Sequence, residues 1–284
     1  MVHYGHGAQP PHHSFIEPYC DSLAHSRPTM IRWLVQSVLD HADLAAGLPP
    51  SGLLTPTELD HYNGYYSPRR RRDWLLGRWT AKHLIREHLA RIAGFRPCFT
   101  AFTIAQDPSG APYVKGLVPA LTCHGDRRIP LGISISHSHC HALCAVASGR
   151  GQTAPRLGAD IELVQPQDDL LTGNFFTPDE HAAIITAMPV GVDLITTATR
   201  SAKESVLKAT HVGLRADPHT VQCILRPLRP RMWTPFQIEF REPPPPVTGQ
   251  GCRQSFGGWW RIIESRLRPG VIFVLTLAAQ GIAL

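Results

Sequence analysis

Hydrophobic positions along this chain follow two periods, which predict a mixture of strands and helices. The run MIRWLVQSV over residues 30–38 is rich in branched and aromatic residues and suits a strand, although its pattern alone also allows a helix. Further strands are predicted over residues 133–147 (with a break at the histidines), 157–164, 233–240, 258–263 and 271–278. Helices are predicted after Pro68, where apolar residues recur at helical spacing, and over residues 198–211. We therefore expect an α+β fold.

One sequence pattern that is typical of a helix start occurs twice along the chain. In Thr55-Pro56-Thr57-Glu58 and again in Thr177-Pro178-Asp179-Glu180, threonine can act as N-cap, proline takes the first helical position and glutamate completes a capping box. Each half thus contains a strand followed by a capped helix, which predicts two similar lobes over residues 29–150 and 151–284. Residues 1–28 lack apolar periodicity and predict an irregular extension, and Pro243 to Pro246 predict a linker.

Composition and charge narrow the class of protein. With 43% hydrophobic and 18% charged residues among 284, the chain is neither a disordered acidic segment nor a coiled coil. The net charge of +6 favours an anionic ligand or partner without choosing among nucleotide, nucleic acid and acidic protein. The apolar stretch at residues 271–279 is too short to span a membrane, no secretory signal is visible, and the seven cysteines form no Cys-x-x-Cys pair. We expect a cytoplasmic protein with free thiols and no membrane contact.

The first candidate for chemistry is the pair Asp160 and Glu162. Strand alternation would place both carboxylates on one face while Ile161 points into the core. Mg²⁺ prefers a few carboxylates together with water and phosphate oxygens, so the pair could form half of a magnesium site. The alternative is a pair of solvated residues at a sheet edge.

The second candidate is Lys203-Glu204-Ser205-Val206-Leu207-Lys208. Glu204 and Lys208 could form an ordinary helical ion pair. However, only four of the 28 basic residues are lysines, and two of them lie within this segment. A compact ammonium group near a phosphate is therefore the functional alternative.

Histidine and arginine clusters supply two further candidates. Ser136 and His137 at a strand end could hold a phosphate, whereas His137, His139 and His141 could instead be zinc ligands of a hydrolase. A zinc hydrolase would favour an aspartate directly before His141, where this chain has a cysteine. The run from Arg69 to Arg72 continues to Arg78 and could grip phosphates or form a solvated basic face. Nucleic-acid binding is a third possibility, without a recognisable nucleic-acid motif to support it.

The order of these blocks resembles a known family. The blocks are Arg72-x-x-Leu75-Leu76-Gly77-Arg78, Gly110-x-Pro112, Ile135-Ser136-His137-Ser138, Gly158-x-Asp160-x-Glu162, Phe176-x-x-x-Glu180 and Lys203-Glu204-Ser205-x-x-Lys208. Together, over about residues 30–279, they resemble the Sfp-type 4′-phosphopantetheinyl transferases. The resemblance implies two α+β lobes related by a pseudo-twofold axis, with coenzyme A and Mg²⁺ in the cleft between them.

The resemblance also implies roles for individual residues. Asp160, Glu162 and Glu204 would be the Mg²⁺ ligands, and Glu204 or a metal-bound water would be the base. Lys208 would serve catalysis and bind phosphate. The implied coenzyme A contacts are Arg72, Arg78, Ser136, His137, Lys203 and Lys208.

The implied reaction moves the phosphopantetheine group to a serine of an acyl or peptidyl carrier protein and releases 3′,5′-ADP. The partner would be an acidic helical carrier of fatty acid, polyketide or nonribosomal peptide biosynthesis, and the enzyme would act as a monomer. Two positions depart from the family pattern: Arg200 replaces an aromatic residue, and Ala111 replaces a basic one.

Overall fold

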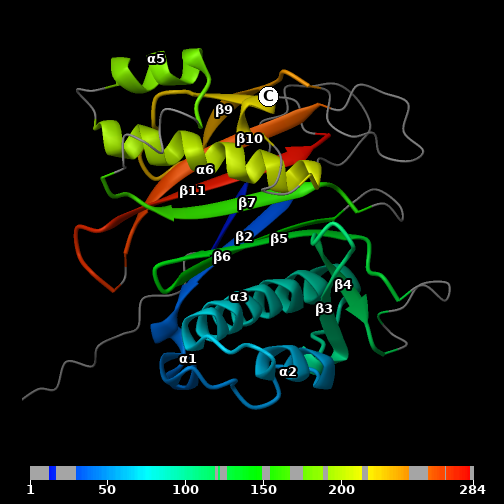
Figure 1. Ribbon diagram of the computed structural model, residues 1–284. Coiled ribbons are helices and arrows are strands. Elements are labelled where there is room, and N and C mark those ends of the chain that lie inside the picture. Colours follow the sequence, from blue (N-terminus) through cyan, green and yellow to red (C-terminus); the bar gives the residue numbers. More distant parts are fainter. Residues whose placement is uncertain are drawn as a thin grey trace, which may run out of the picture.

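Two antiparallel sheets, each covered on its outer face by one long helix, dominate the computed structural model (Figure 1). The structure describes residues 13–16, 30–118, 121, 127–148, 154–166, 175–187, 191–212, 217–242, 255–265 and 267–281. The predicted linker at Pro243 to Pro246 lies outside these residues. None of the helices in the described ranges is long and apolar enough to cross a membrane.

The first sheet has the order β1-β2-β6-β5 and the second β7-β11-β10-β9-β8. The strands of the first sheet are β1 (His13–Ile16), β2 (Ile31–Ser37), β5 (Leu131–Ser138) and β6 (His141–Ser148). Those of the second are β7 (Leu157–Leu163), β8 (Val221–Leu225), β9 (Thr234–Phe240), β10 (Phe256–Glu264) and β11 (Ile272–Gln280). A separate hairpin pairs β3 (Phe102–Gln106) with β4 (Pro112–Gly116).

The helices follow the signals that the sequence carries. They are α1 (Ala42–Ala46), α2 (Pro56–Asn63), α3 (Pro68–Ala93), α5 (Pro178–Thr186) and α6 (Val192–Thr210), with 3₁₀ turns at Val38–Asp40, Phe99–Ala101 and Pro218–Thr220. Both predicted capping boxes form, because the Thr55 and Thr177 side chains accept from the backbone of Glu58 and Glu180. The expected α+β class is confirmed.

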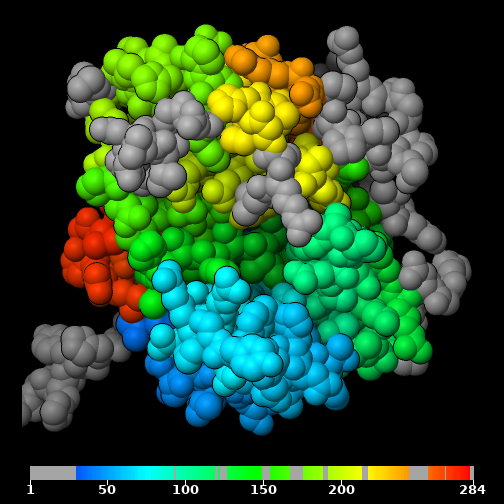
Figure 2. All heavy atoms as spheres, in the orientation of Figure 1, coloured from blue at the N-terminus to red at the C-terminus, as the bar shows by residue number. Residues whose placement is uncertain are grey.

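Alternating side chains divide the interior into layers. Trp33 of β2 and Leu275 of β11 belong to an apolar core between the two sheets. Their neighbours Leu34 and Val274 point the other way, into cores under α3 and α6 respectively. The order of layers is therefore helix, sheet, sheet, helix. In Figure 2 the blue and cyan atoms lie at the bottom of the molecule and the light green, yellow and orange atoms toward the top, with darker green atoms between them.

The two sheets meet along strands β5 and β7, which are the terminal strands of their respective sheets. They lie side by side at the centre of Figure 1. The Ala159 backbone N–H donates to Ser134 Oγ at 2.9 Å across this junction. Residues from both halves of the chain can thus approach one another here.

A buried lysine–glutamate ion pair occurs in each half of the chain. Glu58 on α2 pairs with Lys82 on α3, with Oε2 and Nζ 2.6 Å apart. Glu180 on α5 pairs with Lys203 on α6, again at 2.6 Å. In both cases the other carboxylate oxygen accepts a backbone N–H from a neighbouring strand region. Both lysines are fully buried, so each pair fixes its short helix against its long one.

The N-terminal region departs from our expectation. Residues 1–28 were expected to be irregular, but His13–Ile16 form strand β1, which pairs antiparallel with β2. Four residues are too few to show a period, and the open edge of β2 supplies the backbone partners. The rest of this extension lies outside the described residues. The division at residues 29–150 and 151–284 stays a prediction.

Candidate active site

Three carboxylates gather where β7 faces α6. Asp160 and Glu162 come from β7 and Glu204 comes from α6, and one oxygen from each lies within 4.8 Å of the others. Gly158 permits this approach, because a Cβ atom there would collide with the backbone carbonyl of Ser205. The strand alternation predicted for Asp160 and Glu162 thus places both beside a helix from a distant part of the sequence.

Asp160 is buried and held on both oxygens. Its Oδ1 accepts from Ser136 Oγ at 2.7 Å and from Lys208 Nζ at 2.6 Å. Its Oδ2 accepts from Ser201 Oγ at 2.8 Å. Lys208 also donates to the Ala159 carbonyl at 3.2 Å. The carboxylate is therefore oriented by β5 and α6 together.

The negative charges of the carboxylates repel one another, which shifts their pKa values. Burial, followed by repulsion from Asp160, raises the pKa of Glu204 to about 7, and the same two causes raise the pKa of Glu162. Arg200 offsets part of this repulsion: its Nη2 lies 3.1 Å from Glu162 Oε1 and its Nε lies 3.7 Å from Glu204 Oε1. Burial opposes the charge on Lys208, but Asp160 and Glu204 outweigh it and raise the pKa of its ammonium group.

The carboxylate cluster fits a hard divalent cation. Carboxylate oxygens are the ligands that Mg²⁺ prefers, and Asp160 is already oriented by hydrogen bonds. A dication would also relieve the mutual repulsion that raises the pKa of Glu162 and Glu204. Within the described ranges, these three residues are the one group of histidine, cysteine and carboxylate side chains with metal-binding spacing.

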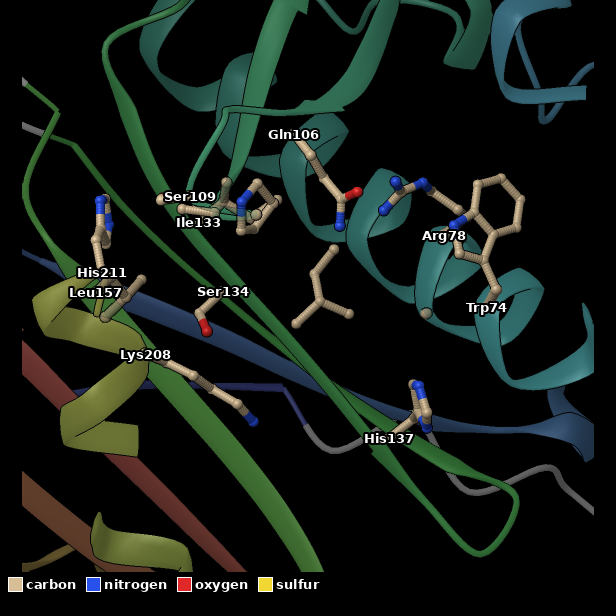
Figure 3. Close-up of a pocket in the computed structure, with 15 residues that line it drawn as sticks. Trp74, Arg78, Gln106, Ser109, Ile133, Ser134, His137, Leu157, Lys208 and His211 are labelled. Carbon is tan, nitrogen blue, oxygen red and sulfur yellow. The ribbon is translucent and has the colours of Figure 1, made fainter. Parts of the chain in front are cut away.

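A cavity of about 270 Å³ lies next to this cluster and shares Lys208 with it. Figure 3 shows Lys208 on α6 reaching toward β5, with Trp74 and Arg78 on α3 across the cavity and His137 on β5. The Arg78 guanidinium is 4.7 Å from the Trp74 ring centroid and donates to the Ile104 carbonyl at 3.3 Å. Cationic groups from both halves of the chain therefore border one cavity.

The other predicted contacts are placed differently. Ser136 bonds Asp160 beside the cavity. Lys203 is fully buried and paired with Glu180, so it is not available to a phosphate, and its position argues against the predicted contact. The exposed Arg72 side chain lies against Gly47 and does not line the cavity. The spacing of Lys203 and Lys208 in the sequence could not show that the two side chains lie in different surroundings, one against Glu180 and the other against Asp160.

The histidines do not form a metal cluster. The turn between β5 and β6 places His139 at a φ of 45° and leaves it exposed. His141 is buried, and its ring centroid lies 4.4 Å from that of Phe273. Among the described residues, the group with metal-binding spacing contains no histidine, which argues against the zinc hypothesis. The arginine run is also divided, because Arg69 pairs with Asp73 while Arg71 donates to the Tyr65 carbonyl.

Three site residues were not predicted from sequence. Ser201 orients Asp160, Arg200 bridges two carboxylates, and Trp74 stacks on Arg78 at the cavity. Helical spacing offered one signal, since Arg200, Glu204 and Lys208 recur every four residues on one face of a helix. The roles of Ser201 and Trp74 follow only from their contacts in the folded structure.

Comparisons with known proteins were made on the sequence and on the structure. Residues 156–241 match the family model of the 4′-phosphopantetheinyl transferase superfamily. Holo-[acyl-carrier-protein] synthase from Neisseria meningitidis is 23% identical over 42% of this chain and 97% of its own, with a TM-score of 0.31. Holo-ACP-synthase from Plasmodium yoelii is 14% identical over 42% and 94%, with a TM-score of 0.30. No curated protein matches the chain.

The matched segment contains Asp160, Glu162, Glu204 and Lys208. At the level of the superfamily, the resemblance predicted from the sequence motifs is confirmed: over residues 156–241, this chain matches the 4′-phosphopantetheinyl transferases.

Proposed function

We propose that this protein is an Sfp-type enzyme that transfers 4′-phosphopantetheine from coenzyme A to a serine of a carrier protein and releases 3′,5′-ADP. The observation that carries the proposal is the shared position of Lys208. Its ammonium group borders the cavity and is also bonded to Asp160 of the carboxylate cluster. A polyanionic ligand in the cavity would therefore have its phosphates beside the candidate metal site.

The cavity supports coenzyme A as the ligand through its cationic groups and its aromatic lining. Arg78 and His137 lie at its border opposite Lys208, and Trp74 offers an aromatic surface. Burial lowers the pKa of Arg78, yet a guanidinium group stays charged at neutral pH even after such a shift. We assign Arg78, His137 and Lys208 to phosphate binding and leave Lys203 out.

In the proposed reaction, a new bond forms between the carrier serine oxygen and the β-phosphorus of coenzyme A, and the bond from that phosphorus to the bridging oxygen of the α-phosphate breaks. Glu204 is the base we propose for the serine proton, because it is the carboxylate of the cluster that α6 carries one helical turn from Lys208. Lys208 stabilises negative charge on the departing phosphate, and Asp160 orients Lys208.

Asp160, Glu162 and Glu204 would hold Mg²⁺. When bound, the cation would supply Lewis-acid stabilisation of the phosphate charge. Ser136 and Ser201 keep Asp160 in place for this role.

We propose an acidic helical carrier protein as the partner and a monomer as the active form. Arg69 and Arg70 are exposed at the start of α3, and the net charge is +6, which supports an acidic partner. The cavity takes residues from α3, β5 and α6 of a single chain, which supports the monomer. The free thiols of Cys98, Cys140, Cys144 and Cys223 support a cytoplasmic location.

The test is intact-mass spectrometry of apo acyl and peptidyl carrier proteins incubated with this protein, coenzyme A and Mg²⁺. We expect a gain of about 340 Da, one phosphopantetheine group, that disappears with EDTA. Glu204→Gln should abolish the gain while leaving the folded state intact, and Glu242→Gln, at an exposed position outside the site, should not change it. No gain on any carrier together with no binding of coenzyme A would overturn the proposal.

A further inference from the structure

Arg200 contacts two of the three carboxylates that form the candidate metal site. Its side chain is 35% exposed, and its guanidinium group lies between Glu162 and Glu204. The contacted atoms are Glu162 Oε1, at 3.1 Å from Nη2, and Glu204 Oε1, at 3.7 Å from Nε. Burial lowers the pKa of Arg200, but the two glutamates outweigh it and raise the pKa, so the guanidinium is fully charged.

The same two glutamates supply two of the three carboxylates in the candidate metal site. A guanidinium group and a divalent cation are alternative ways to neutralise the same carboxylates. Cations that contact the same oxygens also repel one another, and the repulsion is strong in a partly buried site. Bound metal and the observed Arg200 contacts should therefore oppose each other.

Two cationic residues of α6, Arg200 and Lys208, pair with different carboxylates of the cluster. Arg200, Glu204 and Lys208 lie one helical turn apart in succession. Lys208 bonds Asp160 and the Ala159 carbonyl, which anchors it on the cavity side. Arg200 pairs with Glu162 and Glu204 and, at 35% exposure, is more exposed than Lys208, whose side chain is 22% exposed. Of the two cations, Arg200 is therefore the one that pairs with the glutamates of the candidate metal site on its more exposed side.

We propose that Arg200 is a built-in competitor of the divalent cation: its guanidinium holds Glu162 and Glu204 until the metal displaces it, and it thereby sets the metal concentration at which the site fills. This inference rests on the metal site of the proposed function. It adds a positioning residue that acts through the metal ligands rather than on the substrate.

The test measures metal binding directly, with Mn²⁺ as the probe and the loss of the free-Mn²⁺ electron paramagnetic resonance signal as the readout. The full chain is compared with Arg200→Gln, which removes the charge, and with Arg200→Lys, which keeps a charge but loses the guanidinium fork. Arg96→Gln is the matched control, because Arg96 forms an exposed ion pair with Glu87 outside the cluster. Circular dichroism confirms that each variant is folded.

Two partly exposed ion pairs to the ligands correspond to roughly a tenfold effect on affinity. We expect Arg200→Gln to bind Mn²⁺ about tenfold more tightly than the parent, Arg200→Lys to be intermediate, and Arg96→Gln to equal the parent. Unchanged or weaker Mn²⁺ binding in Arg200→Gln would overturn the inference, as would the absence of Mn²⁺ binding in all proteins. If Arg200→Gln does not fold, Arg200→Lys decides in the same way, because affinity equal to the parent would overturn the inference.

Coenzyme A binding and carrier modification distinguish this inference from the proposed function. Modification of the carrier without tighter Mn²⁺ binding in the variants would leave the function standing and remove the role of Arg200. Tighter Mn²⁺ binding without any carrier modification would support the role of Arg200 and count against the transferase. Loss of coenzyme A affinity in Arg200→Gln without a gain in Mn²⁺ affinity would make Arg200 a phosphate contact instead and overturn the inference.

Discussion

The buried pair of Lys203 and Glu180 provides a direct test of how the structure assigns the two lysines of α6. Both side chains are fully buried, and Nζ lies 2.6 Å from Oε2. Replacing Lys203 with methionine removes the ammonium group and leaves the Glu180 carboxylate charged inside the protein. The carboxylate keeps its bonds from the backbone N–H groups of Thr177 and Cys223, so it stays in place without its counter-ion.

Breaking a buried ion pair on one side costs about 3–5 kcal/mol. This is a large part of the roughly 5–15 kcal/mol that stabilises a typical domain. We expect Lys203→Met to lower the free energy of unfolding by this amount. The double variant Lys203→Met with Glu180→Gln should recover part of it, since no uncompensated buried charge remains. Lys82→Met, in the corresponding pair, should cost less, because Arg78 Nε remains 4.0 Å from Glu58 Oε1.

The assay is urea unfolding followed by tryptophan fluorescence, which the six tryptophans make sensitive. Coenzyme A affinity is then measured by calorimetry without urea, where Lys203→Met should remain within about twofold of the parent because the residue does not reach the cavity. Lys208→Met should instead weaken coenzyme A binding. An unchanged unfolding midpoint together with lost coenzyme A affinity in Lys203→Met would refute this reasoning and restore Lys203 as a phosphate contact.

Two further predictions concern packing and pH. Gly158→Ala should lower the free energy of unfolding by about 1–3 kcal/mol and weaken Mn²⁺ binding, because the new methyl group pushes β7 away from α6. Calorimetric melting and the Mn²⁺ titration measure these two effects. A melting temperature equal to the parent's would contradict the prediction. Burial, followed by repulsion from Arg32, lowers the pKa of the buried His88 from 6.5 to about 4. Its neutral form is therefore favoured in the folded state, and its contribution is present above pH 6.5 and is lost as the pH falls toward 4. Urea unfolding at both pH values should show that His88→Gln reduces this loss by up to about 3 kcal/mol, whereas identical pH profiles would exclude the effect.

The sequence was informative wherever a local pattern decides the structure. The capping boxes at Thr55 and Thr177 formed as predicted, because a threonine N-cap, a proline and a glutamate satisfy the helix start within four residues. The strand alternation around Ile161 placed Asp160 and Glu162 together for the same reason. The strand at His13–Ile16 was missed, since its pairing depends on a partner strand and not on its own pattern.

For the site, the sequence by itself determined which chemical groups exist and their spacing along each element: two carboxylates on one strand, and a glutamate and two lysines on one helix. Only the tertiary structure decided which of those groups meet. It separated Lys203 from Lys208, because packing buries one against Glu180 and turns the other toward Asp160. It also brought Arg200 onto two metal-site carboxylates. These contacts join residues on different elements, and their energies depend on burial and distance, which the order of residues along a chain does not contain.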